Sequence, residues 1–570
     1  MNTMTEARNL EAAQRAAGKT HLGAPEALVE TLVVHQIREV FGVIGASRPE
    51  AADLLPGAGI RMLSVAQRES AAHMAHGYGR AGNRLAVCVG PSGPGLIDFV
   101  PAVASAYWAR TPLVVVTPEA GSYAAGHGSM FSQITRWQTH VSSPSQVADA
   151  LHRALAIAWH ERGPVQVSLS DDCLRGEGDY EIRPPLVIER SAGGARSLAK
   201  AAQLLAAARF PAIVAGEGVA IIDCCDAVKA LAEQLTAPVV STFRHNDSFP
   251  ANHPLACGPL GPHGSKAAMR VLAEADVVLA LGTRLAGGAS WREDAKVIQI
   301  DSDDRALSVA AEVTLAIHGD PGLAAAELLG HFKGRAARKS DKARRAEVQR
   351  EKESWAAELA AQPSPHRKGR IGARRALAQL AKALPRNALV ATDVGQVCSM
   401  ASSYLGFEQP GSFLAAMDGA GRGCAYPTAL GAKLAQPGRP AIAYVGEGAW
   451  AISLAEVMTA VKEKIPAIAV VFNNELGNAE RKGQAAGALR AAANPPTPDF
   501  SEVASEMGAE GYRCEYEDEV ADALKAALKS GKPAVVEIMV TPERGEIFGR
   551  EGARKTRRSS SQQRETVAAD

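Results

Sequence analysis

Short runs of apolar residues alternate with longer Ala-rich stretches along most of this chain. In its first third, four runs have the length and continuous apolar character of buried parallel strands. They are RMLSVA, RLAVCVG, PLVVVTP and VQVSLS. Between them, RESAAHMAHGYGRAG and LIDFVPAVASAYWAR have the amphipathic pattern of helices. This alternation predicts repeated strand–helix units around a parallel sheet.

The same alternation returns twice. After a Pro-rich break near residue 190 the strand-like runs are PAIVAGEG, PVVSTF, DVVLALG and KVIQID. After the linker AAQPSPHRKGR they are ALVATDVG, PAIAYVG, AIAVVFN and AVVEIMV. We therefore predict an α/β fold of three doubly wound parallel-sheet domains, with the first and third built alike.

The expected domain boundaries follow from these breaks. The three domains are predicted at residues 24–190, 191–365 and 366–548. The second includes the charged segment GRAARKSDKARRAEVQREKESWAAEL, whose composition suits a solvated helix, and the linker after it. Residues 549–570 are basic and Ser-rich, which predicts a disordered tail.

Composition narrows the class of protein. The 570 residues exceed the roughly 250–300 at which a single core stops growing. A formal net charge of +1 gives no reason to expect a nucleic-acid partner. The eight cysteines include no CxxC pair, so neither a zinc site nor a disulfide framework is indicated, and a reduced cytoplasm is the expected location. The polar N-terminus lacks the apolar core of a secretory signal, and the longest apolar runs are too short to span a bilayer.

Two fragments in the last third carry candidate chemistry. In YVGEGAW a strand runs into Gly446, Glu447 and Gly448 and then a helix, and in AVVFNNELGN a strand ends at Asn473 and Asn474. The glycines permit a close approach of phosphate to backbone N–H groups at a helix start. Glu447 and Asn474 offer the oxygen ligands that Mg²⁺ takes together with phosphates. The pair predicts a metal and diphosphate site, whereas Gly-x-Gly alone is as typical of a structural turn.

A candidate acid lies in the first third. Glu69 follows a predicted strand at the start of a helix, where the helix dipole alone would stabilise a carboxylate. The loop GPSGPG further along follows another buried strand, which is where α/β folds bind ligands. Among the histidines His73, His127, His140 and His263 are candidate acid–base groups, although such residues more often belong to the core or surface. His127, in AAGHGS, has the strongest case because its loop is expected beside this site.

Together these features resemble the thiamine-diphosphate enzymes of the acetolactate synthase superfamily. The resemblance implies that the first domain binds the pyrimidine of the cofactor and the third binds its diphosphate. It assigns the activating glutamate to Glu69 and the Mg²⁺ ligands to Glu447, Asn474 and the backbone carbonyl of Leu476. The diphosphate contacts implied in this way are Gly395, Gln396, Gly446, Gly448 and Ala449.

Longer stretches are similar to the sulfoacetaldehyde acetyltransferase family. They include HNDSFPANHPLACGPLGPHGSKAAMRVLAEADVVLALGTRL and GEGAWAISLAEVMTAVKEKIPAIAVVFNN, and the similarity runs in order over roughly residues 24–548. It implies a C–C bond-cleaving transferase or lyase that converts sulfoacetaldehyde and phosphate to acetyl phosphate and sulfite. It also implies a small anionic substrate, a homodimer or homotetramer that shares the cofactor between subunits, and no need for flavin. AGEGVAIID leaves a nucleotide-binding turn open as an alternative.

The chain departs from the family pattern around the expected site. Glu447 stands where the family has Asp, and Arg422 stands where relatives have an uncharged residue. The loop Pro91–Gly95 stands where the family has Gln-Asn-Gly-Pro-Gly, so it lacks the two side-chain amides of that loop. The segments after TPEAG, after Gln484 and at AGGASWRED are shortened or altered relative to the family. Two alternatives therefore stay open. One is a related carboligase or decarboxylase for another 2-oxo acid or aldehyde, and the other is a non-catalytic paralogue that keeps the fold.

Overall fold

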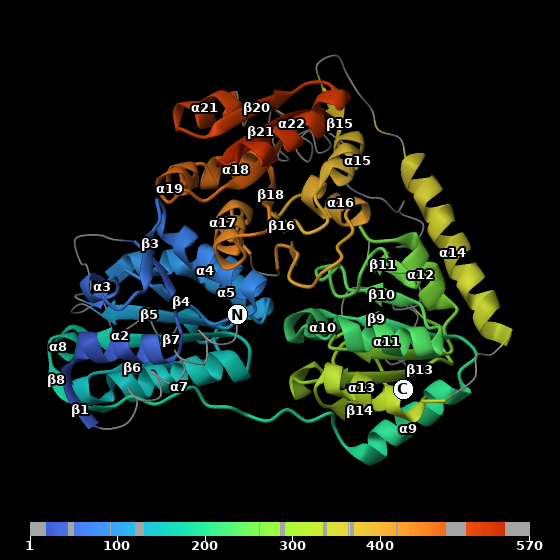
Figure 1. Cartoon of the computed structure of the whole chain (residues 1–570), viewed down its shortest axis with the longest axis horizontal. Coiled ribbons are helices and arrows are strands. Elements are labelled where there is room, and N and C mark those ends of the chain that lie inside the picture. The colour runs from blue at the N-terminus through green and yellow to red at the C-terminus, as the bar shows by residue number, and fades with distance from the viewer. Residues whose placement is uncertain are drawn as a thin grey trace, which may run out of the picture.

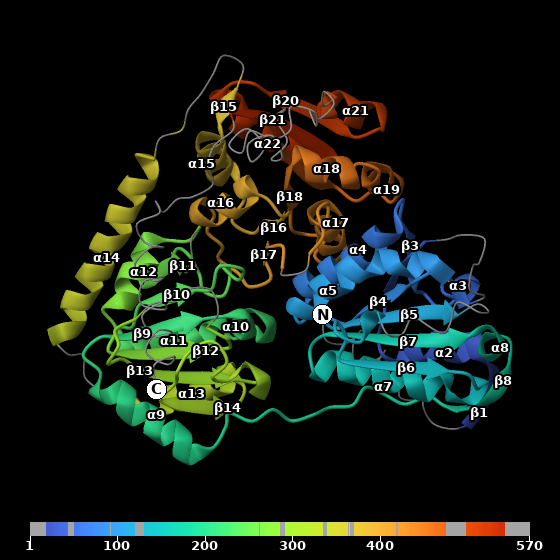
Figure 2. The ribbon, with the colours of Figure 1, turned by 180° about the vertical axis from the view of Figure 1, so that it is seen from behind.

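The chain folds into three α/β lobes grouped around a common centre. The computed structural model describes residues 19–43, 51–91, 93–119, 130–261, 263–285, 291–334, 339–362, 364, 370–417, 420–474 and 498–541. In Figure 1 the C-terminal lobe (orange and red) lies above the N-terminal lobe (blue and cyan) and the middle lobe (green). The view from behind shows the same arrangement, with the long helix α14 along the outer edge of the middle lobe (Figure 2).

The first domain is built on a six-stranded parallel sheet in the order β3-β2-β4-β5-β7-β6. Its strands are β2 (Glu39–Gly42), β3 (Arg61–Ser64), β4 (Ala86–Val89), β5 (Leu113–Glu119), β6 (Trp137–Val141) and β7 (Pro164–Ser170). A separate antiparallel pair is formed by β1 (Lys19–Gly23) and β8 (Glu177–Glu181). The helices are α2 (Ala24–Val34), α3 (Ala51–Leu54), α4 (Arg68–Gly82), η1 (Gly93–Phe99), α5 (Val100–Trp108), η3 (Pro144–Gln146), α7 (Val147–His160) and α8 (Asp171–Leu174).

The middle domain repeats the plan with the order β11-β10-β9-β12-β13-β14. Its strands are β9 (Pro211–Ala215), β10 (Val239–Ser241), β11 (Ala256–Pro259), β12 (Val277–Leu281), β13 (Lys296–Asp301) and β14 (Leu315–His318). Its helices are α9 (Ala195–Ala207), α10 (Glu217–Ile222), α11 (Cys225–Leu235), α12 (Lys266–Ala273), η4 (Asp304–Ala306), α13 (Pro321–His331) and α14 (Lys339–Ala360). The predicted solvated helix α14 is anchored by Arg344, Val348 and Trp355, which are buried at helical spacing on one face.

The third domain has a seven-stranded parallel sheet in the order β15-β21-β19-β18-β16-β17, with β20 also paired to β21. Its strands are β15 (Ile371–Gly372), β16 (Leu389–Thr392), β17 (Phe413–Leu414), β18 (Ala441–Gly446), β19 (Ala467–Asn473), β20 (Glu510–Cys514) and β21 (Ala534–Thr541). Its helices are α15 (Ala373–Ala383), α16 (Gln396–Tyr404), α17 (Ala425–Ala435), α18 (Glu447–Ser453), α19 (Glu456–Lys462), α21 (Phe500–Glu506) and α22 (Glu517–Ser530).

Each parallel sheet contains a point near its middle at which the direction of winding reverses, so the predicted doubly wound α/β fold is confirmed. The reversal falls between β2 and β4, between β9 and β12, and between β16 and β18. The first and third domains are alike in this respect, because α4 and α17 are the helices that cross back over their sheets. Ligands of such sheets bind at the carboxyl ends of the strands beside the reversal point.

The cores explain why the first and third domains meet. Successive residues of a strand point to opposite faces of the sheet. In β18, Ile442 and Tyr444 belong to a core on one face, whereas Ala443 and Val445 belong to a core that also contains Phe41 and Met74 of the first domain. One apolar cluster therefore continues from the first domain into the third.

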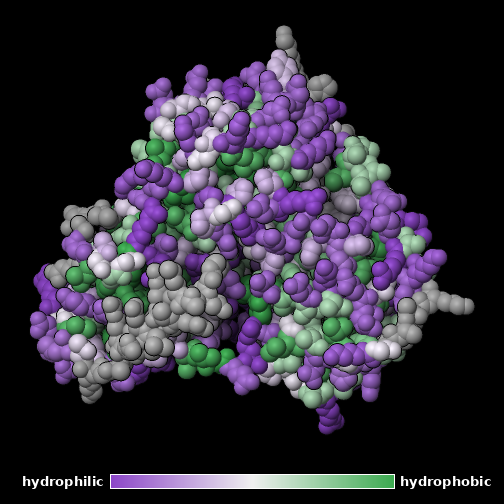
Figure 3. All heavy atoms as spheres, in the orientation of Figure 1, coloured by the Kyte–Doolittle hydropathy of each residue, from purple (hydrophilic) through white to green (hydrophobic). Residues whose placement is uncertain are grey.

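Polar side chains cover much of one face of the molecule (Figure 3). Figure 3 shows hydrophilic side chains over much of the visible face, with hydrophobic side chains in separate small groups. Within the described ranges, no helix has both the length and the apolar character that crossing a bilayer requires.

Candidate active site

Helices α4 and α17 cross in contact, and this crossing brings two strand ends together. A Cβ on Gly77 of α4 would overlap the backbone carbonyl of Thr428, and a Cβ on Gly431 of α17 would overlap that of Met74. Glycine at both positions lets the two backbones touch. The start of α4, after β3, is thereby held beside the loop that leads into α17.

Glu69 lies in the first turn of α4 and faces this loop. A Cβ on Gly421 would lie 3.1 Å from Oε1 of Glu69, so the acid and the third domain are in contact. The same oxygen lies 3.3 Å from Nε2 of His73, one helical turn further on. The His73 side chain is 2% exposed, and the Glu69 side chain is 30% exposed. The acid is therefore held by a buried imidazole and stays open to a ligand.

Glu456, which the sequence reading missed, fixes the approach to Glu69. Its carboxylate is fully buried and accepts hydrogen bonds from the backbone N–H groups of Ala66, at 3.4 Å, and Gln67, at 2.9 Å. Thr459 also donates to this carboxylate. A single acidic residue within the apolar stretch SLAEVM indicates a buried carboxylate that needs a hydrogen-bond partner. The sequence does not identify that partner, because Gln67 lies 389 residues away in the chain.

The predicted metal ligands lie at the ends of two neighbouring strands. The register pairs Gly446 of β18 with Phe472 of β19, so Glu447 and Asn473 come next at the same sheet edge and Asn474 one residue further. Asn473 turns inward and donates to Glu537 at 2.7 Å. Asn474 is half-buried, and its backbone carbonyl accepts from Arg370 at 3.3 Å. Leu476 lies outside the described residues.

The predicted diphosphate contacts border the reversal point of the third sheet. Gly395 precedes α16, whose first residue is the exposed Gln396, and Gly446 precedes α18. A Cβ on Gly446 would meet no atom within 4 Å, and one on Gly395 would meet only a sulfur 4.0 Å away. Ala449, by contrast, is buried. The free space above these two glycines, with a carboxylate and an amide at the next strand ends, fits a diphosphate bound with a divalent cation.

Glu447 and Asn474 are a sparse set of ligands. In the part of the chain that the structure describes, no group of three or more His, Cys, Asp or Glu side chains is placed to hold a metal ion. Mg²⁺ is commonly bound by one or two protein oxygens, with phosphate oxygens and water completing the octahedron. The donor set therefore suits a cation that arrives with a phosphate ligand.

Asp393 fixes the loop between the two halves of the site. Its buried carboxylate accepts hydrogen bonds from the backbone N–H groups of Val394 at 2.7 Å, Gly423 at 3.0 Å and Ala425 at 3.1 Å. Burial raises the pKa of this carboxyl group, and the three N–H donors act in the opposite direction. Arg422, within this loop, is exposed, and its guanidinium lies against Gly448.

Of the four candidate histidines, those that the structure describes lie in different parts of the fold. His73 belongs to the site through Glu69. His140 lies in β6, where its ring contacts Ser168 at 3.1 Å and Glu119 at 3.0 Å. The ring of His263 lies 6.2 Å from that of Phe243 in the middle domain. His127 falls outside the described residues, as do most of the altered loops.

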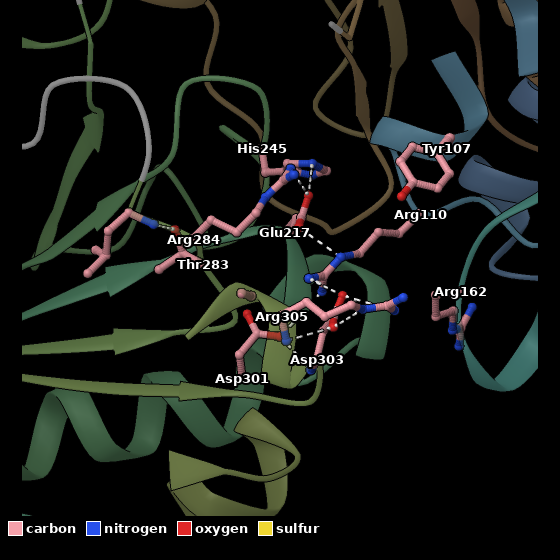
Figure 4. A network of polar contacts seen from close by, with 12 residues as sticks. Tyr107, Arg110, Arg162, Glu217, His245, Thr283, Arg284, Asp301, Asp303 and Arg305 are labelled. Carbon is pink, nitrogen blue, oxygen red and sulfur yellow. Dashed lines mark hydrogen bonds and ion pairs between the residues drawn. The ribbon is translucent and has the colours of Figure 1, made fainter. Parts of the chain in front are cut away.

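The reversal point of the middle sheet is filled by protein. A Cβ on Gly216 would overlap the carbonyl of Gly282, so the Gly-Glu-Gly turn packs directly on the end of β12. Arg110 of the first domain reaches over this turn and pairs with Glu217 at 3.0 Å, Asp301 at 3.3 Å and Asp303 at 3.1 Å (Figure 4). This turn therefore takes part in packing between the first and middle domains.

Three family models match the chain in the order of its domains. They are described as the thiamine pyrophosphate enzyme N-terminal TPP binding domain, central domain and C-terminal TPP binding domain, at residues 23–140, 198–328 and 393–538. The chain belongs to the thiamine pyrophosphate enzyme family, which confirms the resemblance found in the sequence.

Individual relatives show which members of this family the chain resembles. The chain is 42% identical to the sulfoacetaldehyde acetyltransferase of Castellaniella defragrans, over 94% of this chain and 96% of that protein. It is 40% identical to that of Alcaligenes xylosoxydans xylosoxydans, over 93% and 95%. A probable acetolactate synthase large subunit of Methanocaldococcus jannaschii is 28% identical over 91% and 92%.

Proposed function

We propose that the protein is a thiamine-diphosphate-dependent acetyltransferase that converts sulfoacetaldehyde and phosphate to acetyl phosphate and sulfite. The observation that carries the proposal is the contact between Glu69 and the Gly421 loop beside the third-domain glycine turns. It occurs in a chain similar to sulfoacetaldehyde acetyltransferases over nearly its whole length.

The reaction written with balanced atoms breaks a carbon–sulfur bond and no carbon–carbon bond. Sulfite leaves with the electron pair of that bond, and the aldehyde carbon is oxidised to the acyl level while the neighbouring carbon becomes a methyl group. An oxygen of phosphate then forms the new bond to the acyl carbon. Bound thiamine diphosphate supplies the carbanion chemistry for such a redistribution of electrons.

The roles proposed for individual residues follow from the family and the site. Glu447, Asn474 and the carbonyl of Leu476 are proposed to hold Mg²⁺, which in turn holds the diphosphate. The diphosphate contacts are proposed to be Gly395, Gln396, Gly446, Gly448 and Ala449. Glu69, whose side chain is 30% exposed beside the third domain, is proposed to exchange a proton with the pyrimidine ring.

Removing the acid of Glu69 tests the proposal. E69Q keeps the size of the side chain but cannot exchange the proton, so sulfite release is expected to fall by about 100-fold or more. Sulfite and acetyl phosphate are assayed together, with E353Q, an exposed α14 variant, as the control. Equal activity of E69Q and wild type would exclude the role of Glu69, and a wild-type enzyme that forms neither product would exclude the proposed reaction.

We also propose that the protein acts as a homodimer or homotetramer in the cytoplasm. Ile97, Val394, Ile452 and Met458 are between 41% and 57% exposed, which suits burial in a second copy. Residues 183–190 join the first and second domains as exposed chain without helix or strand, a connection that permits exchange of the first domain between copies. The eight cysteines are free thiols, in keeping with a reducing compartment.

Mixing two inactive variants tests whether a site is shared. In a dimer with exchanged first domains, E69Q and E447A place both defects in one site and leave the other intact. Co-expression would then restore about a quarter of wild-type activity for random pairing of two copies. Absence of any recovery, together with a monomer in light scattering, would contradict the proposed assembly.

A further inference from the structure

Arg422 lies at the mouth of the candidate active site. Its side chain is exposed, and its guanidinium packs on Gly448, where a Cβ would overlap one of the guanidinium nitrogens. The residue before it, Gly421, lies beside Oε1 of Glu69. Over the ranges that the structure describes, no protein group pairs with this guanidinium by hydrogen bond or ion pair. It is thus available to a ligand that enters between Glu69 and Gly448.

The backbone that carries Arg422 is rigidly held on its C-terminal side. The next residue, Gly423, has φ +90°, which favours glycine, and donates its N–H to the buried Asp393 at 3.0 Å. Ala425 donates to the same carboxylate oxygen at 3.1 Å. A Cβ on Gly423 would also come within 2.8 Å of Ile452 of α18. These contacts fix the point from which the guanidinium projects toward Gly448.

The negative charge at the mouth of the site would oppose the binding of an anionic ligand unless a cation lies nearby. Glu69 lies beside Gly421, the residue before Arg422, so a carboxylate borders the approach to this guanidinium. Without a positive group, this carboxylate would repel an anionic ligand. A guanidinium also offers two parallel N–H donors, which match two oxygens of a phosphate or sulfonate.

We propose that Arg422 is the residue that binds the tetrahedral oxyanion of a reactant, either the sulfonate of the aldehyde or the acceptor phosphate. The inference rests on the proposed function, because both of its reactants carry such a group. Arg422 is then a specificity-determining residue that admits small oxyanions to the site.

Calorimetric titration of the full chain tests this without turnover. Inorganic phosphate and methanesulfonate are titrated into wild type, R422A and R422K, each saturated with thiamine diphosphate and Mg²⁺ and again without them. R422A is expected to bind at least one probe about tenfold more weakly. R422K is expected to bind it with intermediate affinity, since the positive charge remains but the two parallel N–H donors of the guanidinium are lost. R386A removes an 82% exposed arginine of the third domain and should match wild type.

Two results would overturn the inference. One is equal binding of both probes to R422A and wild type. The other is a loss confined to the affinity for thiamine diphosphate, which would place the guanidinium on the cofactor instead of a reactant.

Steady-state kinetics identify the source of the oxyanion. A raised KM for phosphate in R422A assigns Arg422 to the acceptor, and a raised KM for sulfoacetaldehyde assigns it to the donor. An R422A enzyme with both values unchanged would contradict the inference. If wild type forms no acetyl phosphate, the proposed function fails, whereas the two titrations still decide whether Arg422 binds an oxyanion.

Discussion

Individual residues of the site are positioned by groups far away in the chain. Glu69 is held through His73 on its own helix and through Glu456, which binds the backbone just before the helix. Asp393 does the same for the loop that carries Arg422. A buried carboxylate that accepts hydrogen bonds from backbone N–H groups holds that backbone in place. If the backbone moved away, the buried charge would lose its hydrogen-bond donors, which is costly.

The same physics gives a pH dependence at His35, the residue that follows α2. Its ring is 7% exposed and contacts His152 at 3.1 Å, and burial lowers its pKa to about 4. The unfolded chain takes up this proton near pH 6.5, whereas the folded chain does so only near pH 4. The stabilisation from neutral His35 is therefore complete above pH 6.5 and is lost as the pH falls, by up to about 1.4 kcal/mol per pH unit.

Replacing His35 removes this titration. H35Q should show a shallower fall of the thermal midpoint than wild type between pH 6.5 and pH 4.5, measured by scanning calorimetry. The comparison between the two proteins cancels the titration of other groups. Parallel pH profiles for the two proteins would show that His35 takes up no proton on unfolding in this range.

At the scale of elements, sequence patterns located the interior of the fold well. The predicted helix at RESAAHMAHGYGRAG coincides with α4, Arg68–Gly82, and the continuous apolar runs became central strands such as β5 and β19. β17 was not among the predicted strands, because its two residues are too few to show a periodic pattern.

Contacts between domains were beyond such patterns. The ends of β18 and β19 were expected to meet, since both belong to one parallel sheet. The pairing of Gly77 with Thr428 and of Glu456 with Gln67 depends instead on how two domains dock, which local sequence does not encode. The roles of Glu69, Glu447 and Asn474 stay predictions that rest on the family resemblance.

The crossing of α4 and α17 supports a prediction for both stability and activity. G77A places a methyl group against the carbonyl of Thr428, so the helices must separate or the backbone must shift. We expect a loss of about 1–3 kcal/mol in stability and reduced activity, because Glu69 begins the same helix. G330A in α13 meets no atom within 4 Å and serves as the helical control, which should fold and act as wild type. A G77A enzyme as stable and active as the control would mean that this contact does not hold the site.

At the scale of the whole molecule, buried ion pairs tie the first domain to the middle domain. Arg110 is 7% exposed and links Glu217, Asp301 and Asp303 of the middle domain (Figure 4). Burial alone would lower the pKa of Arg110, but the three carboxylates outweigh it and the pKa is raised. The guanidinium is therefore firmly charged. Its removal leaves Asp301 without a cation, whereas Glu217 keeps Arg284 and Asp303 keeps Arg305.

R110A is expected to destabilise the protein by about 3–5 kcal/mol, because it leaves the fully buried carboxylate of Asp301 unpaired. R292A, which removes a surface arginine paired with the exposed Asp294, should have nearly the stability of wild type. Urea unfolding followed by fluorescence measures the stability of both variants. In R110A alone, the first and middle domains should separate at a lower urea concentration than in wild type. Equal midpoints for the two variants would contradict the role of the network.

The reversal point of the third sheet is proposed to be the cofactor site. The most direct test is calorimetric titration of thiamine diphosphate into the metal-free full chain, with and without Mg²⁺, for wild type and E447A. We predict tight binding that requires Mg²⁺ in wild type and is weakened about tenfold or more in E447A, since a charged metal ligand is lost. Absence of binding at millimolar cofactor, or binding that is the same without Mg²⁺ and in E447A, would contradict it.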